Sequence, residues 1–323
     1  MKQFIKNNDL ETIKEGWKGN VKIGNEYANG DTRDKQTMPL DVMKWKFSKN
    51  PQAEEKNKDT FRLKVIKNTN FLTSKEDMIV WLGHATFFIR INGKTILTDP
   101  VLNDVSIIKR LTGVACDVED LKEIDYILLS HGHRDHFDKK TLKVIFKNNP
   151  NIEALIPMEL NSFFDKNNIK NQQAGWYQKY NTAEGLEIYF MPAKHWNRRG
   201  ALDFNRNLWG SFVLKTAAKT IYFSGDTAYG NHFTETSTFF NKIDYCLLSV
   251  GAYKPEIIMK DAHMNPTEAL QAFQDLKGTT FIPMHFGTYD LSDEPIGEPK
   301  RILEKETDKY NIKFLDIGEP LEI

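Results

Sequence analysis

The sequence contains few cysteines, no long apolar run and no excess of charge of either sign. Its two cysteines, Cys116 and Cys246, do not form a CxxC pair, which argues against a cysteine metal site, and both are predicted to be buried thiols. No run is long and apolar enough for a transmembrane helix, and residues 1–20 are too polar for a secretion signal. We therefore expect a cytoplasmic protein with no integral membrane segment.

The chain carries 44 basic and 44 acidic residues, so its formal net charge is zero. A chain without an overall positive field has no general attraction to nucleic acid or to an anionic membrane surface. Nucleic acid is therefore not an expected partner. The length of 323 residues is enough to bury the core of an enzyme. The sequence does not fix the oligomeric state, for which a homodimer is one candidate.

The residue composition divides the chain into a polar arm over 1–75 and a main domain over 76–323. We expect the arm to pack on the main domain. Strands are predicted at 79–91, 94–98, 126–129, 154–156, 186–191, 212–215, 220–223, 245–250 and 280–283. Helices are predicted at 139–147, 266–276 and 299–309, and Asn265 and Glu268 stand where a capping box would start the second. Strands with intervening helices occur in both halves, which predicts two packed sheets with helices outside.

One short loop gathers an unusual number of side chains that bind metals. It follows the predicted strand 126–129 and reads Ser130-His131-Gly132-His133-Arg134-Asp135-His136-Phe137-Asp138. Imidazole and carboxylate groups suit zinc, and groups this close along a tight loop can face two neighbouring ions. The alternative is a polar loop whose histidines cap a helix, but so many ligand-type side chains after a buried strand rarely serve capping. The loop therefore predicts a metal site.

A site for two metals needs ligands from other segments, and three further candidates each follow a predicted strand. They are His195, Asp226 and His285. Each has an ordinary alternative: His195 could cover apolar surface, Asp226 could be a turn residue, and His285 could be a satisfied core histidine. Their joint position at strand ends favours the metal site.

The loop resembles the HxHxDH hallmark of the metallo-β-lactamase superfamily, and a histidine, an aspartate and a histidine follow it in order. The resemblance implies an α/β fold in four layers, an αββα sandwich of two mixed β-sheets with helices on the outer faces. It also implies seven ligands for two zinc ions. One ion would be held by His131, His133 and His195, the other by Asp135, His136 and His285, and Asp226 would bridge them.

Four further stretches carry a closer resemblance. They are Trp81-Leu82-Gly83-His84-Ala85-Thr86, Pro192-Ala193-Lys194-His195-Trp196, Gly225-Asp226-Thr227 and His263-Met264-Asn265-Pro266-Thr267-Glu268-Ala269. These stretches resemble N-acylphosphatidylethanolamine-hydrolysing phospholipase D and its bacterial relatives. The resemblance implies a small-molecule or lipid substrate with a phosphodiester or ester bond.

Three more residues gain expected roles from these resemblances. Asp99 would support the loop over 130–138, called the ligand loop below, without binding metal. Alternatively, the Asp-Pro pair could simply form a turn. His84 would support the site by a hydrogen bond or be an ordinary buried histidine. His263 would line the site, or would only pack at the start of the helix after Asn265.

Two adjacent zinc ions can hold a bridging hydroxide near neutral pH, because metal binding lowers the pKa of water from 15.7 to about 7. We expect this hydroxide to attack a phosphodiester in line, which makes the protein a phospholipase D-like phosphodiesterase. Asp135 would orient the nucleophile or accept a proton, and His263 would protonate the leaving group.

Other functions remain open at the level of sequence. The same metal core could hydrolyse a lactone, a cyclic phosphate or another ester. Redox chemistry is a second alternative, but related di-iron proteins carry a carboxylate where this chain has His133, which favours zinc, with manganese or iron as substitutes. Seven filled ligand positions disfavour a binding module without catalysis, and the zero net charge disfavours a nuclease.

A loop over 197–208 is expected to help select the substrate. Arg198 and Arg199 could meet an anionic group there, or could be ordinary surface charges. His232 is predicted to be a surface residue.

Overall fold

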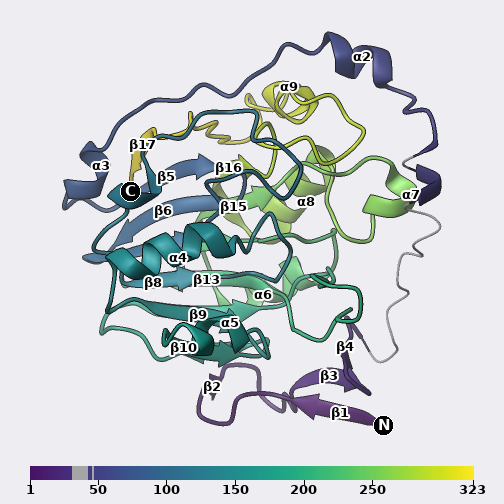
Figure 1. The fold of residues 1–323 in the computed structure, drawn as a ribbon. Coiled ribbons are helices and arrows are strands. Elements are labelled where there is room, and N and C mark those ends of the chain that lie inside the picture. The colour runs from purple at the N-terminus through teal and green to yellow at the C-terminus, as the bar shows by residue number, and fades with distance from the viewer. Residues whose placement is uncertain (31–42, 46) are drawn as a thin grey trace.

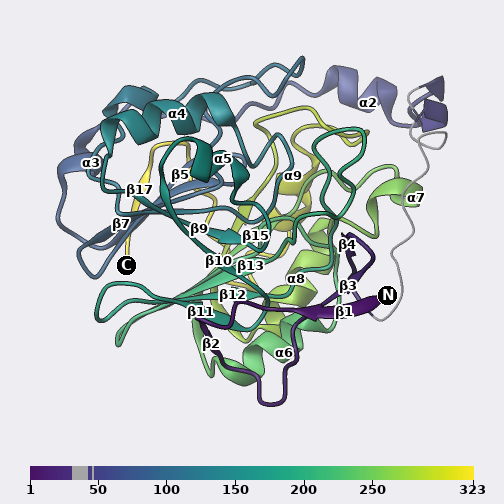
Figure 2. The same cartoon turned by 60° about the horizontal axis from the view of Figure 1, so that its bottom comes forward.

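Two β-sheets packed face to face form the centre of the molecule. The computed structural model describes residues 1–30, 43–45 and 47–323, and within them each large sheet has seven strands. Helices cover the outer face of each sheet, so the layers are helix, sheet, sheet and helix (Figure 1 and Figure 2). This arrangement confirms the predicted four-layer αββα fold.

The first sheet has the strand order β10-β9-β8-β7-β6-β5-β17. Its strands are β5 (Met78–Gly83), β6 (Thr86–Ile91), β7 (Lys94–Thr98), β8 (Tyr126–Leu128), β9 (Glu153–Pro157), β10 (Lys170–Ala174) and β17 (Pro320–Glu322). Strands β7 to β10 run parallel, whereas β5, β6 and β17 pair antiparallel. Every residue of β5 and β6 is buried, which explains their nearly continuous apolar sequence.

The second sheet has the strand order β16-β15-β14-β13-β12-β11-β2. Its strands are β2 (Glu11–Thr12), β11 (Gln178–Tyr180), β12 (Glu187–Met191), β13 (Ser211–Lys215), β14 (Thr220–Phe223), β15 (Ile243–Ser249) and β16 (Gly278–Met284). Strands β14 to β16 run parallel and the others antiparallel, so both sheets are mixed. Phe87 of β6 and Phe223 of β14 meet edge to face between the sheets, within one apolar core.

Helices α4 (Lys139–Asn148) and α5 (Ser162–Lys166) cover the first sheet, and α6 (His232–Phe239) and α8 (Pro266–Asp275) cover the second (Figure 2). The side chain of Asn265 accepts a hydrogen bond from the backbone N–H of Glu268, and the side chain of Glu268 accepts one from the backbone N–H of Asn265. These two bonds confirm the predicted capping box. Further short helices in the described part of the chain are α2 (Ala53–Lys58), α3 (Asn70–Thr73), η1 (Val118–Asp120), α7 (Glu256–Met259) and α9 (Glu298–Glu304).

The amino-terminal arm adds strands of its own to this framework. Strands β1 (Lys2–Ile5), β3 (Asn20–Ile23) and β4 (Glu26–Tyr27) form a small antiparallel sheet, and β2 pairs with β11 at the edge of the second large sheet. The arm therefore extends the second sheet, besides lying against it. A domain boundary at residue 75 stays a prediction.

Some sequence predictions differ from the structure. The predicted strand 79–91 is two strands, because Gly83 and His84 adopt φ angles of 104° and 53° and turn the chain between β5 and β6. The last helix ends at Glu304, five residues before the predicted end. Both cysteines are free and buried, as predicted. Among the described residues, no helix combines the length and apolar character needed to span a bilayer.

Candidate metal centre

The candidate ligands meet at one edge of the sandwich, where strands of both sheets end. Parallel neighbours end at the same edge of a sheet, and β7 with β8, and β14 to β16, are parallel. The ligand loop follows β8, Asp226 follows β14, and His285 follows β16. The fold therefore brings together side chains that lie far apart in the sequence.

Four side chains form a first group around His133. Its members are His131, His133, His195 and Asp226, each with one ligand atom within 4.8 Å of the others. The Nδ1 atom of His133 lies 2.8 Å from Nε2 of His131 and 3.2 Å from Nε2 of His195. Three imidazole nitrogens thus converge from two separate segments, which is the arrangement of a three-histidine zinc site.

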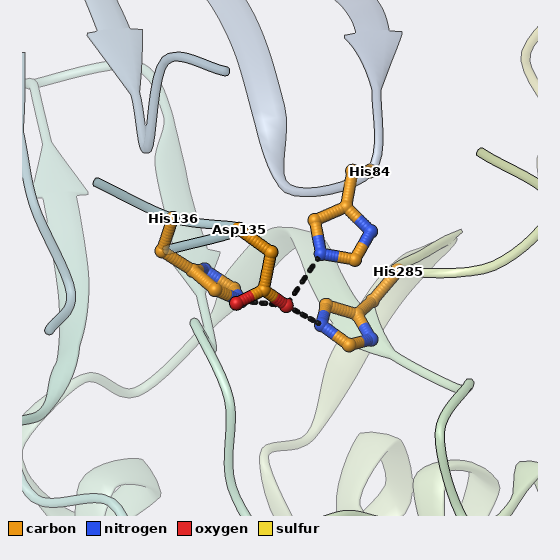
Figure 3. Close-up of side chains that lie close together, drawn as sticks. All are labelled: His84, Asp135, His136 and His285. Carbon is orange, nitrogen blue, oxygen red and sulfur yellow. Dashed lines mark hydrogen bonds and ion pairs between the residues drawn. The ribbon is translucent and has the colours of Figure 1, made fainter. Parts of the chain in front are cut away.

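A second group surrounds the carboxylate of Asp135 (Figure 3). Its Oδ2 atom lies 3.1 Å from Nε2 of His84, 3.6 Å from Nε2 of His285 and 3.7 Å from Nε2 of His136. His84 makes a hydrogen bond to Asp135, the kind of contact expected of a residue that supports the site.

The carboxylate of Asp226 lies between the two groups. Its Oδ2 atom is 3.0 Å from Nε2 of His136, and its Oδ1 atom is 3.1 Å from Nε2 of His285, both in the second group. The same Oδ2 atom is 3.9 Å from Nε2 of His131 and of His195 in the first group. One side chain is therefore in a position to serve both groups.

Several of these atoms are buried without a hydrogen-bond partner. They are Nε2 of His136 and of His285, and Oδ1 of Asp226. Buried polar atoms in folded proteins almost always have a partner, so a cluster of lone ones calls for a bound group. Neutral imidazole nitrogen and carboxylate oxygen are ligands of zinc, so the residues fit two divalent cations. Metal binding by each named residue stays a prediction.

The histidines of the first group are held in the form that binds metal. Burial, reinforced by the neighbouring imidazoles, lowers the pKa of His131 and of His195 well below its usual value. Burial likewise lowers the pKa of His133 to about 4. All three rings are neutral at pH 7, and a histidine binds metal as the neutral ring.

The second group has the opposite electrostatics. Burial works to lower the pKa of His285, but attraction to Asp226 and Asp135 outweighs it and raises the pKa to about 9. The same two carboxylates raise the pKa of His136 well above its usual value, again against burial. The two carboxylates therefore attract positive charge, which protons supply in the protein alone and which bound cations would supply in their place.

Asp99 occupies the supporting position that the sequence indicated. Its carboxylate accepts the backbone N–H of Ser130 at 2.7 Å and the Nδ1–H of His136 at 2.7 Å. The Ser130 hydroxyl also donates to Asp99, at 2.5 Å. These bonds fix His136 in the tautomer that leaves Nε2 facing the group, and they tie the start of the ligand loop to the end of β7.

His263 lies at the margin of the two groups. Its Nδ1 atom is buried without a hydrogen-bond partner, 3.9 Å from Oδ2 of Asp226. Its ring centre is 5.3 Å from that of His195 and 5.5 Å from that of His285. The side chain is 13% exposed, so it can reach both the buried groups and an incoming substrate.

The expectation for His232 needs correction, and the two arginines whose role the sequence left open have defined contacts. His232 is half-buried against Thr227, with 3.1 Å between its Nε2 and the Thr227 hydroxyl, and is not a surface residue. Arg199 donates to the backbone carbonyls of Gly132 and Phe137, so its guanidinium fastens the loop over 197–208 to the ligand loop. The guanidinium of Arg198 likewise donates to carbonyls of its own loop.

Sequence reasoning missed the polar side chains that hold the ligand segments. Asn197 accepts the backbone N–H of Gly132, and Asn29 of the arm hydrogen-bonds the backbone of His195. It also missed Trp196, whose ring lies 4.4 Å from that of His133. Trp196 could have been noticed because it directly follows a candidate ligand. The two asparagines could not, since their partners are 65 and 166 residues away.

Comparison with known families agrees with this geometry. The model of the Beta-lactamase superfamily domain matches residues 94–286. The chain is 29% identical to N-acyl-phosphatidylethanolamine-hydrolyzing phospholipase D 1 of Caenorhabditis elegans over 74% of either protein. It is 34% identical to the mitochondrial N-acyl-phosphatidylethanolamine-hydrolyzing phospholipase D of Saccharomyces cerevisiae over 69% of this chain, but it covers only 50% of that protein.

A UPF0173 metal-dependent hydrolase of Pelotomaculum thermopropionicum is 32% identical over 76% of this chain and 99% of the relative. Among solved structures, a metallo hydrolase of Ignicoccus hospitalis superposes with a TM-score of 0.60 at 18% identity, over 76% of this chain and 98% of that one, which supports the fold. With its fold, its buried histidine and aspartate groups and these relatives, the chain belongs to the metallo-β-lactamase superfamily, in the branch related to N-acyl-phosphatidylethanolamine-hydrolysing phospholipase D, and is a metal-dependent hydrolase.

Proposed function

We propose that this protein is a dinuclear zinc phosphodiesterase of the phospholipase D-like type. The observation that carries the proposal is the position of Asp226, whose two oxygens lie between two separate groups of buried ligand atoms. A single-metal site would leave the ligand atoms of one group buried with no cation to bind. A non-catalytic relative would not need to keep both groups complete.

The ligands divide into two sets with one shared member. We assign His131, His133 and His195 to one set and Asp135, His136 and His285 to the other, with Asp226, which contacts members of both, as the shared ligand. Bound zinc supplies Lewis acidity and makes a nucleophile available from water at neutral pH. The remaining chemistry belongs to side chains of this chain.

Asp135 is placed to orient the nucleophile and to take up its proton. Its side chain is 17% exposed, and its Oδ2 atom contacts His84. Burial works to raise the pKa of Asp135, but the charge of His136 and the contacts with His285 and His84 hold it well below its usual value. The group is therefore a carboxylate at neutral pH, as an acceptor requires.

His263 is placed to donate to the leaving group. Its Nδ1 atom lies 3.9 Å from Oδ2 of Asp226, and its side chain is 13% exposed. An oxygen that leaves as an alkoxide needs a proton, whereas a nitrophenolate does not. The role of His263 should therefore depend on the leaving group.

The apolar part of a substrate would lie along the loop that follows His195. Trp196 stands beside His133, and Phe204 lies 6.0 Å from Trp196 between ring centres. Both aromatic side chains are partly exposed, and Leu202 in the same loop is 82% exposed. This apolar wall next to a candidate ligand favours a phosphodiester that carries acyl or other apolar groups, as the names of the relatives suggest.

A substrate panel tests the proposal on zinc-loaded protein. Phosphodiesters with and without acyl chains are compared with lactones and carboxylic esters at equal concentration. We expect the acylated phosphodiesters to have the highest kcat/KM. Faster turnover of lactones or esters would replace the proposal with the alternative of an ester hydrolase on the same metal core.

The His263→Ala variant tests the residue assignment. We expect kcat for alkyl phosphodiesters to fall about 100-fold or more, the range of general acid catalysis, with two zinc ions retained. Phosphodiesters of nitrophenol should be far less affected. Lys260→Ala, an exposed change in the same segment, is the matched control. Equal losses for both leaving groups would remove His263 from this role.

A further inference from the structure

One side chain of the amino-terminal arm holds both polar backbone groups of His195. The Nδ2 of Asn29 donates to the His195 carbonyl at 2.8 Å, and its Oδ1 accepts the His195 backbone N–H at 3.3 Å. His195 lies beyond the end of β12, where an isolated bridge pairs the preceding residue Lys194 with Ala228, and His195 itself belongs to none of the described strands. A single amide that bonds both groups fixes the orientation of the peptide planes on either side of the residue.

The imidazole of His195 is fixed at its other end as well. Its Nδ1–H donates to the carbonyl of Ala262 at 2.9 Å. With Nδ1 engaged, Nε2 is the nitrogen that faces His133 and Asp226. Three hydrogen bonds, two of them with Asn29, therefore fix the direction in which Nε2 of His195 points.

A second chain of hydrogen bonds runs from the arm to the ligand loop. The backbone N–H of Tyr27 in β4 donates to the Asn205 carbonyl at 2.7 Å, and the backbone N–H of Asn205 donates to the Asn197 carbonyl at 2.7 Å. The side chain of Asn197 then accepts the N–H of Gly132 at 2.9 Å. A Cβ atom on Gly132 would lie 2.8 Å from this Asn197 oxygen, so the close approach requires glycine.

These two connections reach only one of the ligand groups. Gly132 lies between His131 and His133, and Asn29 holds His195, so all three histidines of the first group are linked to the arm. The second group is held by other parts of the chain: Asp99 fixes His136, and the His84 carbonyl accepts the backbone N–H of His285. Asp99 also reaches the first group, since the Ser130 hydroxyl contacts both Asp99 and Nδ1 of His131, but the two connections from the arm lead to the first group.

We propose that Asn29 is a positioning residue of the metal centre, through which the arm sets the metal affinity of the His131, His133 and His195 group and not that of the other group. This inference rests on the proposed dinuclear site. Loss of hydrogen bonds that orient ligands costs a metal site about 10- to 100-fold in affinity. The arm thereby becomes part of the active site, although none of its described residues belongs to either group.

The test is the metal affinity of the full-length Asn29→Ala variant, measured by competition with a chromogenic chelator. We expect one of the two ions to bind about 10- to 100-fold more weakly and the other to bind as in the unchanged protein. The visible spectrum of the cobalt-substituted variant should change for the weakened site only. Asn25→Ala, an exposed change in the neighbouring arm turn, is the matched control and should match the unchanged protein in both measurements.

A second variant covers the case in which Asn29→Ala does not fold. Asn29→Asp keeps an oxygen for the His195 N–H but has no N–H for the His195 carbonyl, so it should weaken the same single site. Two ions bound with unchanged affinity in either folded variant, or both ions weakened equally, would overturn the inference. Failure of the unchanged protein to bind two ions would instead overturn the proposed function, so the two failures are distinguishable.

Discussion

The carboxylates of Asp226 and Asp135 explain why the centre favours cations. Both are deeply placed and carry negative charge, because nearby histidines hold their pKa values well below the usual range against the effect of burial. Buried charges need a compensating charge at short range. In the protein alone this is supplied by protonated His136 and His285, and divalent ions would release those protons on binding.

The Asp99→Asn variant tests how the centre is supported. An amide of the same shape tolerates the φ angle of 34° at this position, but it cannot accept the bonds from Ser130 and His136 with the strength of a carboxylate. We expect metal affinity to fall about 10- to 100-fold, mainly at the group that contains His136. The measurement is a chelator titration with Asp308→Asn, an exposed change, as control. Unchanged affinity would show that Asp99 only forms a turn.

At the scale of residues, the sequence identified the side chains that could bind metal but not those that hold them. His195, Asp226 and His285 could be found because each follows an apolar run, which marks a strand end without knowledge of the fold. Asn29 follows no such run, and its importance arises only when the arm packs against a loop far along the chain. A polar side chain in a loop carries no sequence signal of its eventual partner.

At the scale of elements, strands with apolar sequences were predictable and polar edge strands were not. Strand β10 reads Lys-Asn-Gln-Gln-Ala and forms because its backbone pairs with β9 at the edge of the sheet, where side chains need not be apolar. Tertiary pairing therefore decided its structure. The turn at His84 was missed because Gly83 was read as part of one continuous strand.

The link between the arm and α9 gives a prediction at this scale. Asp59 accepts the backbone N–H of Gly297 at 2.8 Å and a bond from Arg301 at 3.0 Å. Burial acts to raise the pKa of Asp59, but these bonds and that from the Phe61 N–H hold it below its usual value. A carboxyl with a lowered folded pKa stabilises the protein above its unfolded pKa of 3.8, and this contribution is lost as the pH falls through the folded value.

We therefore expect Asp59→Asn to reduce the free energy of unfolding at pH 7 by about 1 kcal/mol, a typical value for such hydrogen bonds. The difference from the unchanged protein should shrink once the pH falls below 3.8. Urea unfolding at pH 7 and pH 3 measures the difference in free energy of unfolding between the variant and the unchanged protein, again with Asp308→Asn as control. A difference of the same size at both values would mean that the carboxylate charge contributes nothing.

At the scale of the whole molecule, the two mixed sheets place their strand ends at one edge, and this explains how seven side chains spread from His131 to His285 reach one centre. The layered architecture was predictable because apolar strands and intervening helices recur in both halves. The role of the arm was not, because β2 is only two residues long and leaves no pattern. The boundary at residue 75 remains a prediction, and the homodimer remains one candidate for the oligomeric state.

The most direct test of the account is the number of zinc ions bound per chain. The full-length protein is loaded with zinc, freed of loose metal by gel filtration and measured by elemental mass spectrometry against its protein concentration. The shared position of Asp226 predicts two tightly bound ions per chain. One ion, or none, would contradict the dinuclear centre and the hydrolytic mechanism built on it.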